Sequence, residues 1–301
     1  MTDPLLVTEA VTRRYGYRRV FADVTFSLRR GEVFALLGPN GAGKTTIVEI
    51  LEGYRRRTAG DVDVLGFDPE RNERDFKERI GIVLQESSVE RELTVAETIE
   101  TYGRYYPERL ETGELIDIVG LGEKADARVK TLSGGQKRRL EVALGIVGNP
   151  DLVFLDEPTT GFDPAARRQA WGMIRNLRQL GKTILLTTHY MDEAQNLADR
   201  LAVIDRGKIV AEGTPDTIGG RRSAGTTIRF DARGLPVDAI PLNHVAVAEG
   251  IVEVSTEDPT RDLHVLTAWA VAGGHTLEDL TVTRPSLEDV YLELTDEGTE
   301  G

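Results

Sequence analysis

The sequence predicts an α/β protein in two parts, a large domain with a mostly parallel sheet followed by a small α+β domain. Two observations support this fold class. Short apolar segments alternate with helical stretches over the first two thirds of the 301 residues, as in sheets buried between helices. A polar, glycine-containing segment at 219–225 then precedes a different order of elements. We therefore assign residues 1–218 to the first domain, 219–225 to a linker and 226–301 to a C-terminal accessory domain.

The first domain contains five apolar segments of strand length. They are Val33–Leu37, Ile80–Leu84, Leu152–Leu155, Thr183–Thr187 and Leu201–Ile204. Between Glu86 and Leu132 the strand signal disappears, and two stretches with helical spacing end at glycines. We expect a helical insertion covering about residues 86–145 of the sheet domain.

The second domain shows a shorter alternation of strands and helix. We expect strands at Thr226–Phe230, near Ile251–Ser255 and at Leu280–Thr283, with a helix around Asp262–Ala272. Its size is compatible with a separate small domain. No residue pattern in it indicates catalytic chemistry.

Composition excludes several function classes. The chain has 37 Lys and Arg against 50 Asp and Glu, a net charge of −13, which argues against general binding of nucleic acid. It contains no cysteine, so disulfides and thiolate metal sites are excluded, and a reducing cytoplasm suits it. No apolar run approaches the roughly 18 residues of a membrane span, and the N-terminus lacks the features of a secretory signal. These observations predict a cytoplasmic protein.

A phosphate-binding loop is the clearest motif. Residues 38–46 have the form G-x-x-x-x-G-K-[ST], between an apolar strand and a helical stretch, which is the context that this motif requires. Glycines let the backbone N–H groups approach an anion closely. Lys44 is placed to reach the β- and γ-phosphates, and the Thr45 hydroxyl to ligate Mg²⁺. The expected nucleotide-binding residues are Gly38, Pro39, Asn40, Gly41, Ala42, Gly43, Lys44, Thr45 and Thr46.

Two carboxylates follow the apolar segment that starts at Leu152. Ligands of parallel α/β sheets bind at the carboxyl ends of the strands, so Asp156 and Glu157 should face the nucleotide. Asp156 suits a Mg²⁺ contact, and Glu157 could polarise a water for attack on the γ-phosphate. Taken alone, the pair could equally be two solvated acids at the end of a strand.

A second anion-binding pattern precedes these acids. Leu132-Ser133-Gly134-Gly135-Gln136 opens an obvious helix, so its backbone amides and the positive end of the helix dipole point outward. One nucleotide does not need two such cradles from one chain. Two chains arranged head to tail do, because each can offer its Ser-Gly-Gly turn to the γ-phosphate bound by the other.

With these three elements the chain resembles the ATP-binding subunits of ABC transporters over residues 5 to about 215. The resemblance implies a P-loop NTPase fold of the ABC ATPase type. Gly38–Thr46 is similar to the Walker A loop, and Leu152–Glu157 to the Walker B strand with its catalytic glutamate. Leu132–Gln136 is similar to the signature sequence.

The resemblance implies further site residues. Gln85 is similar to the Q-loop glutamine that senses Mg²⁺ and water and couples to the membrane partner. Asp163 resembles the D-loop aspartate, although Phe162 stands where the family usually has leucine. His189 resembles the switch histidine that contacts the γ-phosphate. Tyr15 resembles the aromatic residue that stacks on adenine, but Tyr17 lies close by and could take that role.

A finer resemblance is to the ATPase subunits of ABC-2-type exporters, the drug-resistance and polysaccharide or lipid-export group. The segments His189–Arg200 and Pro285–Thr295 carry it. It implies an ATPase that dimerises around two Mg-ATP, with a second copy or a similar ATPase, and drives a separate integral membrane subunit at the inner face of the cell membrane. The alternatives are an importer ATPase and a soluble ABC ATPase acting on ribosomes or DNA. The single cassette, the lack of sustained heptads and the acidity disfavour the latter.

Overall fold

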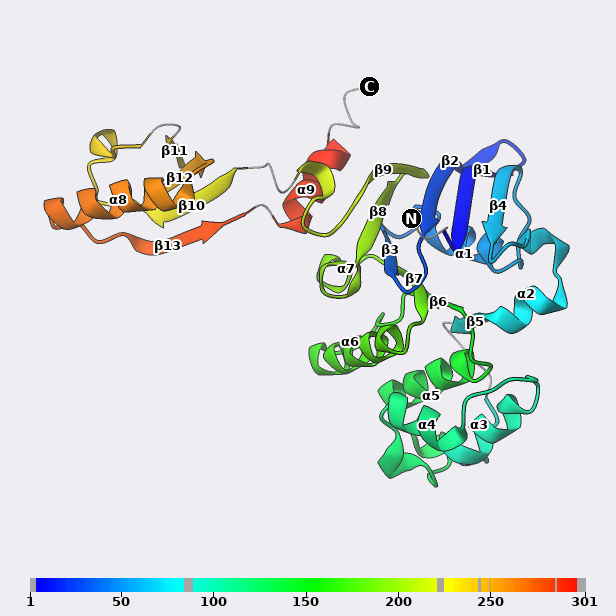
Figure 1. The fold of residues 1–301 in the computed structure, drawn as a ribbon. Helices are drawn as coiled ribbons and strands as arrows, with labels where there is room; N and C mark the ends of the chain where they lie inside the picture. The colour runs from blue at the N-terminus through cyan, green and yellow to red at the C-terminus, as the bar shows by residue number, and fades with distance from the viewer. Residues whose placement is uncertain are drawn as a thin grey trace. The chain divides into compact units, whose positions relative to one another are not determined.

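The computed structural model describes residues 4–83, 89–220, 225–242, 245–248, 250–284 and 286–296. Contacts within the chain divide it into two units, Met1–Pro215 and Asp216–Gly301, which we call the large unit and the small unit. Figure 1 shows the elements of both.

A six-stranded sheet in the order β5-β6-β7-β3-β8-β9 forms the centre of the large unit. Its strands are β3 (Val33–Leu37), β5 (Ile80–Val83), β6 (Leu152–Asp156), β7 (Thr183–Thr188), β8 (Arg200–Asp205) and β9 (Lys208–Gly213). The first five in this order are parallel, and β9 pairs antiparallel with β8. Every residue of β3 is buried, because parallel sheets are covered on both faces. The predicted parallel sheet is therefore confirmed.

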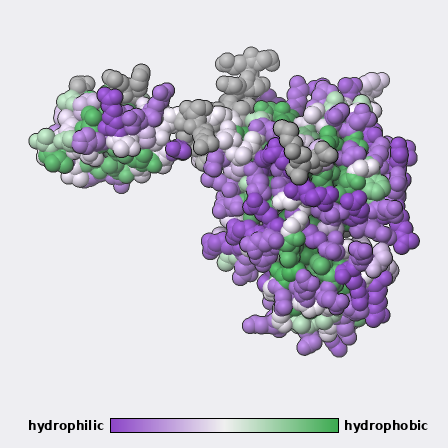
Figure 2. Space-filling view, in the orientation of Figure 1, coloured by the Kyte–Doolittle hydropathy of each residue, from purple (hydrophilic) through white to green (hydrophobic). Residues whose placement is uncertain are grey.

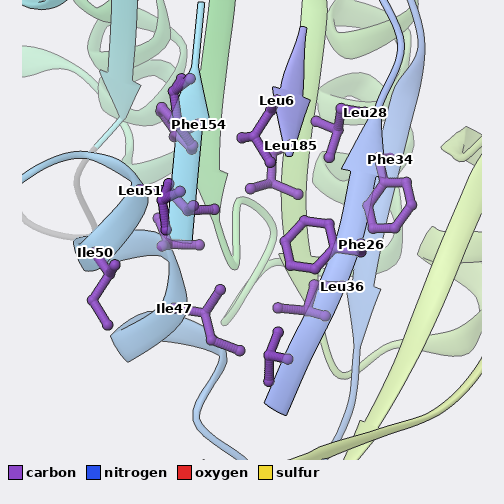
Figure 3. Packing of buried hydrophobic residues seen from close by; sticks show 14 of the residues in the cluster. Leu6, Phe26, Leu28, Phe34, Leu36, Ile47, Ile50, Leu51, Phe154 and Leu185 are labelled. Carbon is purple, nitrogen blue, oxygen red and sulfur yellow. The ribbon is translucent and has the colours of Figure 1, made fainter. Parts of the chain in front are cut away.

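An antiparallel sheet, which the sequence did not predict, packs against it. This sheet has the order β2-β1-β4, with β1 (Leu6–Tyr15), β2 (Arg18–Leu28) and β4 (Ala59–Val64). Together with helix α1 (Lys44–Leu51) it buries the main hydrophobic core, shown in Figure 3. Phe26 of β2 stacks on Phe34 of β3, with 5.3 Å between the ring centroids. This core fixes α1, and hence the loop before it, against the parallel sheet.

Three α-helices lie in the described residues between β5 and β6. They are α3 (Val95–Gly103), α4 (Thr112–Ile118) and α5 (Gly134–Ile146), and the described residues between them form no strand. A capping box at Thr94 and Glu97 starts α3. Helix α5 lies directly on β5, since a Cβ atom added to Gly81 would come within 2.2 Å of the Gly145 carbonyl oxygen. This close contact joins the helical part to the sheet.

Further helices complete the large unit. The α-helices are α2 (Arg74–Arg79), α6 (Pro164–Gln179) and α7 (Met191–Leu197). The 3-10 helices are η1 (Pro69–Arg71), η2 (Gly122–Lys124) and η3 (Val129–Thr131). In Figure 2, hydrophilic residues cover most of the visible face of this unit. Within the part of the chain that the structure describes, no helix has both the length and the apolar character needed to cross a bilayer.

The small unit is an antiparallel sheet of order β11-β12-β10-β13 with its own core. Its elements are η4 (Ile218–Gly220), β10 (Thr226–Asp231), η5 (Val237–Ala239), β11 (Val245–Ala248), β12 (Ile251–Thr256), α8 (Pro259–Gly273), β13 (Glu278–Thr283) and α9 (Leu287–Asp296). Phe230 and Val252 of the sheet and Leu266 of α8 belong to one buried cluster. The sequence predicted β10, β12, α8 and β13 but not β11.

Candidate functional site

The phosphate-binding loop joins the end of β3 to the start of α1, and its glycines have structural reasons. A Cβ atom on Gly38 would come within 2.3 Å of the Ile204 carbonyl oxygen in β8. Gly41 and Gly43 have φ of +83° and +105°, which side chains rarely permit. The loop is thus pressed against the sheet, with the N-terminus of α1 at its end.

The Lys44 side chain folds back onto the phosphate-binding loop. Its side chain is 4% exposed, and its Nζ donates to the carbonyl oxygens of Gly38 (2.8 Å) and Pro39 (3.1 Å). The next residue, Thr45, is exposed in the first turn of α1. The start of a helix offers backbone N–H groups and the positive end of the dipole to an anion. The loop therefore combines a fixed ammonium with outward-facing donors, as phosphate binding requires.

The register of two neighbouring strands places the paired acids. Asp156 ends β6 opposite Thr187 of β7, whose hydroxyl donates to Asp156 Oδ1. The N–H of Glu157 donates to the Thr187 carbonyl (3.2 Å) and hydroxyl (3.1 Å). These bonds hold Glu157 in the left-handed region, at φ of 47°, which a residue other than glycine seldom adopts. Thr187 thus fixes both acids at the carboxyl edge of the sheet.

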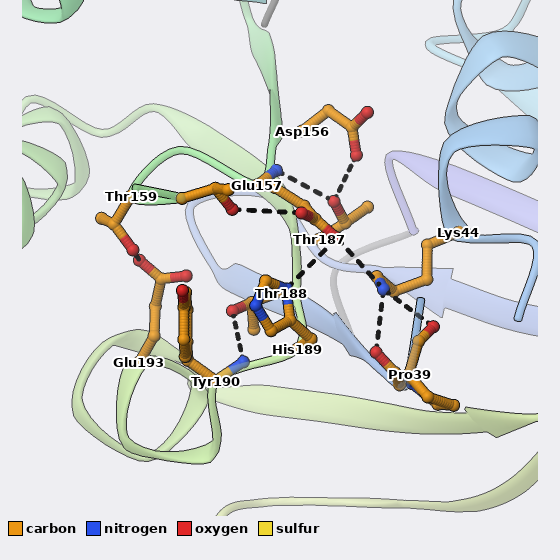
Figure 4. Close-up of polar contacts among 12 residues, drawn as sticks. Pro39, Lys44, Asp156, Glu157, Thr159, Thr187, Thr188, His189, Tyr190 and Glu193 are labelled. Atoms are coloured by element: carbon orange, nitrogen blue, oxygen red, sulfur yellow. Dashed lines mark hydrogen bonds and ion pairs between the residues drawn. The ribbon is translucent and has the colours of Figure 1, made fainter. Parts of the chain in front are cut away.

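Lys44 and His189, which lie far from Glu157 in the sequence, meet at its carboxylate (Figure 4). Its Oε1 lies 3.2 Å from Lys44 Nζ and 3.4 Å from His189 Nδ1, and its Oε2 accepts a hydrogen bond from Thr160 (3.1 Å). Burial raises the pKa of Glu157, but Lys44, Thr160 and His189 outweigh that effect and hold the pKa below its usual value. The carboxylate is therefore ionised at neutral pH, as a residue that polarises water must be.

His189 follows the last residue of β7. Its ring packs on that of Tyr190, with 4.0 Å between centroids, and is mostly buried. Within the described residues its Nδ1 is buried without a hydrogen-bond partner, although it lies near Glu157. The His189 imidazole and the Lys44 ammonium thus approach the same carboxylate oxygen of Glu157.

The Ser-Gly-Gly turn lies at the start of α5. Ser133 is its N-cap and forms a capping box with Gln136. Gly134 and Gly135 line a depression of about 570 Å³ together with Glu157 and other residues of the segment that follows it. Asp163 also lines this depression and caps α6 through bonds from the N–H groups at the helix start. The turn therefore opens onto the same depression as Glu157.

Tyr15 and Tyr17 differ in how firmly they are held. The Arg13 guanidinium lies 4.2 Å from the Tyr15 ring centroid, and Arg55 donates to the Tyr15 hydroxyl. Tyr15 is 43% exposed, whereas Tyr17 is fully exposed at the turn between β1 and β2. A preorganised aromatic ring is better suited to stacking on a base.

The structure thus brings Lys44, Asp156, Glu157 and His189 to one edge of the sheet. Gln85 lies outside the described residues. Sequence reasoning missed Thr187 and Thr160, which hold the acids. The parallel pairing of β6 with β7 would have found Thr187, but the order of strands is not readable from the sequence.

Comparisons with known proteins decide the family. A family model described as ABC transporter matches residues 21–160, and one described as "ABC transporter domain-containing protein-like, C-terminal domain" matches residues 226–286. The chain is 34% identical over 306 residues to a daunorubicin resistance ATP-binding protein of Streptomyces coeruleorubidus, covering 98% of this chain and 97% of that protein. The chain belongs to the ABC transporter ATP-binding proteins. The predicted family is confirmed.

Other ABC proteins extend this result. The chain is 39% identical over 297 residues to the Nod factor export ATP-binding protein I of Rhizobium meliloti, covering 95% of this chain and 86% of that protein. Among solved structures, cbiO1 of Clostridium perfringens has a TM-score of 0.64 at 27% identity, covering 71% of this chain and 90% of that one. An ABC transporter cassette in its ADP conformation has a TM-score of 0.62 at 25% identity, covering 71% and 92%.

These relatives confirm the prediction that the chain is the ATPase subunit of an exporter. The protein is a nucleotide-binding ATPase subunit of the ABC exporter class. The structural neighbours cover about the share of the chain that the large unit occupies, and the matched C-terminal domain lies in the small unit. The cassette fold that the solved structures share with this chain thus corresponds to the large unit.

Proposed function

We propose that this ATPase works as a head-to-tail dimer around two Mg-ATP molecules and drives a separate integral membrane subunit of an exporter. The convergence of Lys44, His189 and Glu157 on one point carries the proposal. Such a cluster can bind a γ-phosphate and polarise the water that attacks it. As an ATPase subunit of an exporter, it would lie peripherally on the cytoplasmic face of the membrane, held by that membrane subunit.

The phosphates of ATP would take over the ion pair that Lys44 makes with Glu157. The ammonium then binds the β- and γ-phosphates, and the Glu157 carboxylate is left to accept a proton from water. Thr45 and Asp156, together with Gln85, supply the hydroxyl, carboxylate and amide oxygens that Mg²⁺ prefers. When bound there, Mg²⁺ would neutralise phosphate charge. His189 then contacts the γ-phosphate with its imidazole.

The remaining site residues fit a dimer. Ser133 is exposed at the start of α5, where the amides of Gly134 and Gly135 form a second anion cradle. We assign this cradle, with Gln136, to the ATP bound by the partner copy, and Asp163 to the surface between the copies. Tyr15 stacks on adenine. Closure of the dimer therefore depends on the γ-phosphate, and hydrolysis reopens it.

Export is favoured over import because two relatives that each cover at least 95% of this chain are named for daunorubicin resistance and Nod factor export. Action on ribosomes or DNA is disfavoured by the net charge of −13. The transported substrate would be selected by the membrane subunit.

The variant Glu157→Gln tests the catalytic assignment. It should bind ATP normally, hydrolyse almost none and form a dimer with Mg-ATP that light scattering detects after gel filtration. Glu108→Gln, an exposed glutamate in the helical part, is the matched control and should behave like the wild type. Undiminished hydrolysis by Glu157→Gln would refute the role of Glu157.

The membrane partner is tested by affinity capture. Tagged Glu157→Gln protein with Mg-ATP is incubated with detergent-solubilised membranes of the native host. Lys44→Ala protein serves as a control whose weakened ATP binding should disfavour the ATP dimer. Recovery of a multi-span membrane protein without an extracellular binding protein supports the exporter. Recovery of ribosomes or DNA-bound proteins instead would refute the transport function while leaving the ATPase site intact.

A further inference from the structure

A buried carboxyl lies behind the catalytic cluster. Glu193 of α7 is 0% exposed, and its Oε1 accepts two hydrogen bonds, from the Thr159 hydroxyl (2.8 Å) and from the indole Nε1 of Trp171 (3.2 Å). Figure 4 shows Thr159 and Glu193 facing each other below the Glu157 segment. A carboxyl is expensive to bury, so a position with no exposure requires an explanation.

These bonds join three segments that carry site residues. Thr159 belongs to the loop between Glu157 and Asp163, and Trp171 belongs to α6, which Asp163 caps. Glu193 lies in the helix that follows His189. One oxygen atom therefore holds the catalytic loop, its following helix and the switch segment together.

The same segments meet at a second set of contacts. The Arg167 guanidinium of α6 lies 4.1 Å from the ring centroid of Tyr190 and pairs with Asp192 at 3.2 Å. Tyr190 in turn packs on the His189 ring. Arg167 also lies close enough to Glu193 for its charge to oppose the rise that burial causes in the pKa of that carboxyl. A displacement of α7 relative to α6 would move the imidazole that lies 3.4 Å from Glu157.

We propose that Glu193 is a positioning residue for ATP hydrolysis, which ties the loop after Glu157 to the segment that carries His189. This rests on the roles proposed above for Glu157 and His189. The backbone of Glu157 is held by Thr187 on one side. On the other side, the Glu193–Thr159 bond holds the loop two residues further on. Without the Glu193–Thr159 bond, the Glu157 carboxylate and the His189 imidazole are free to separate.

The two bonds that Glu193 Oε1 accepts define the matched variant. Burial raises the pKa of Glu193, and the nearby Thr188, Thr159, Trp171 and Arg167, which favour the ionised form, do not offset that rise. A carboxyl and a carboxamide have nearly the same shape, and the carboxamide oxygen can accept the same two bonds. Glu193→Gln should therefore preserve the tie, whereas Glu193→Ala removes it.

The experiment compares steady-state ATPase kinetics of the full chain with Mg-ATP binding by calorimetry. For Glu193→Ala we expect kcat to fall about tenfold to a hundredfold, the penalty of a misplaced catalytic group, with the ATP dissociation constant within about threefold of the wild type. Thr159→Val, which removes only the donating hydroxyl, should lower kcat by a smaller factor. It should also leave the ATP dissociation constant nearly unchanged. Glu193→Gln should retain kcat within about threefold. Gln195→Ala, an exposed change in the same helix, is the control.

Three outcomes would overturn the proposal: unchanged kcat in both Glu193→Ala and Thr159→Val, equal losses of kcat in Glu193→Gln and Glu193→Ala, or a loss of ATP binding in step with kcat. Thr159→Val keeps the test valid if the alanine variant does not fold. His189→Ala and Glu157→Gln are measured alongside. If those two hydrolyse ATP normally, the proposed site fails independently of Glu193.

Discussion

Glu52 is a buried carboxyl whose replacement should stabilise the protein. It follows the last residue of α1, is 8% exposed and lines a cavity of about 650 Å³ with Tyr54, Ile80 and Glu141. Burial, followed by the charges of Asp156 and Glu49, raises the pKa of Glu52 from 4.5 to about 8. The carboxyl is therefore protonated in the folded protein at pH 7. Glu52→Gln keeps its shape and neutrality.

The size of the effect follows from proton linkage. Between pH 4.5 and about 8 the unfolded chain ionises at Glu52 while the folded chain does not, so the folded state binds the extra proton and loses stability as pH rises. At pH 7, about 2.5 pH units above 4.5, this favours unfolding by about 3 kcal/mol, at about 1.4 kcal/mol per unit. Below pH 4.5 the contribution vanishes. Glutamine does not ionise in either state.

The assay is urea denaturation of the nucleotide-free protein at pH 5 and at pH 7.5. The chain has two tryptophans, and a Trp269→Phe background leaves Trp171 as the reporter of the large unit. Relative to the parent, Glu52→Gln should gain on the order of 3 kcal/mol in free energy of unfolding at pH 7.5 and less than about 1 kcal/mol at pH 5. Glu108→Gln, which is exposed, is the control. An equal gain at both pH values would refute the protonation argument, and a loss at pH 7.5 would show that Glu52 is ionised and paired.

Three further predictions concern the site and its support. Lys44→Ala should weaken ATP binding by about tenfold to a hundredfold, because a charge-assisted contact contributes about 1.5–3 kcal/mol, and normal affinity by calorimetry would contradict the phosphate cradle. Tyr15→Ala should weaken ATP binding about tenfold through loss of base stacking while Tyr17→Ala leaves it unchanged, and the reverse order would assign adenine to Tyr17. Gly81→Ala should lower the free energy of unfolding by about 1–3 kcal/mol, because its Cβ would come within 2.2 Å of the Gly145 carbonyl oxygen. The control Gly113→Ala, which meets nothing within 4 Å, should be neutral or stabilising by up to about 1 kcal/mol, and equal losses would exclude the close β5–α5 contact as the cause.

The sequence by itself determined the chemistry and the parallel sheet. The phosphate-binding loop can be recognised from a short stretch of sequence, because a strand, six residues and a helix follow one another directly. Its glycines are required by the positive φ angles of the loop backbone. The apolar strands are readable for a similar reason, because burial on both faces demands continuous hydrophobic runs. Ser133 and Gln136 form a capping box that is encoded within four residues.

Only the tertiary structure decided which distant groups meet. The antiparallel sheet β2-β1-β4 was not predicted, because strands β1 and β2 carry exposed polar residues and contain register shifts. Buried and exposed positions therefore do not alternate regularly along them. Thr187 acts on Asp156 only because β7 happens to neighbour β6 in the order of strands, which no local pattern records. No pattern in the sequence assigns a separate role to Glu193. Its burial against Thr159 and Trp171 depends on how two helices pack, and that is a long-range property that residue spacing does not contain.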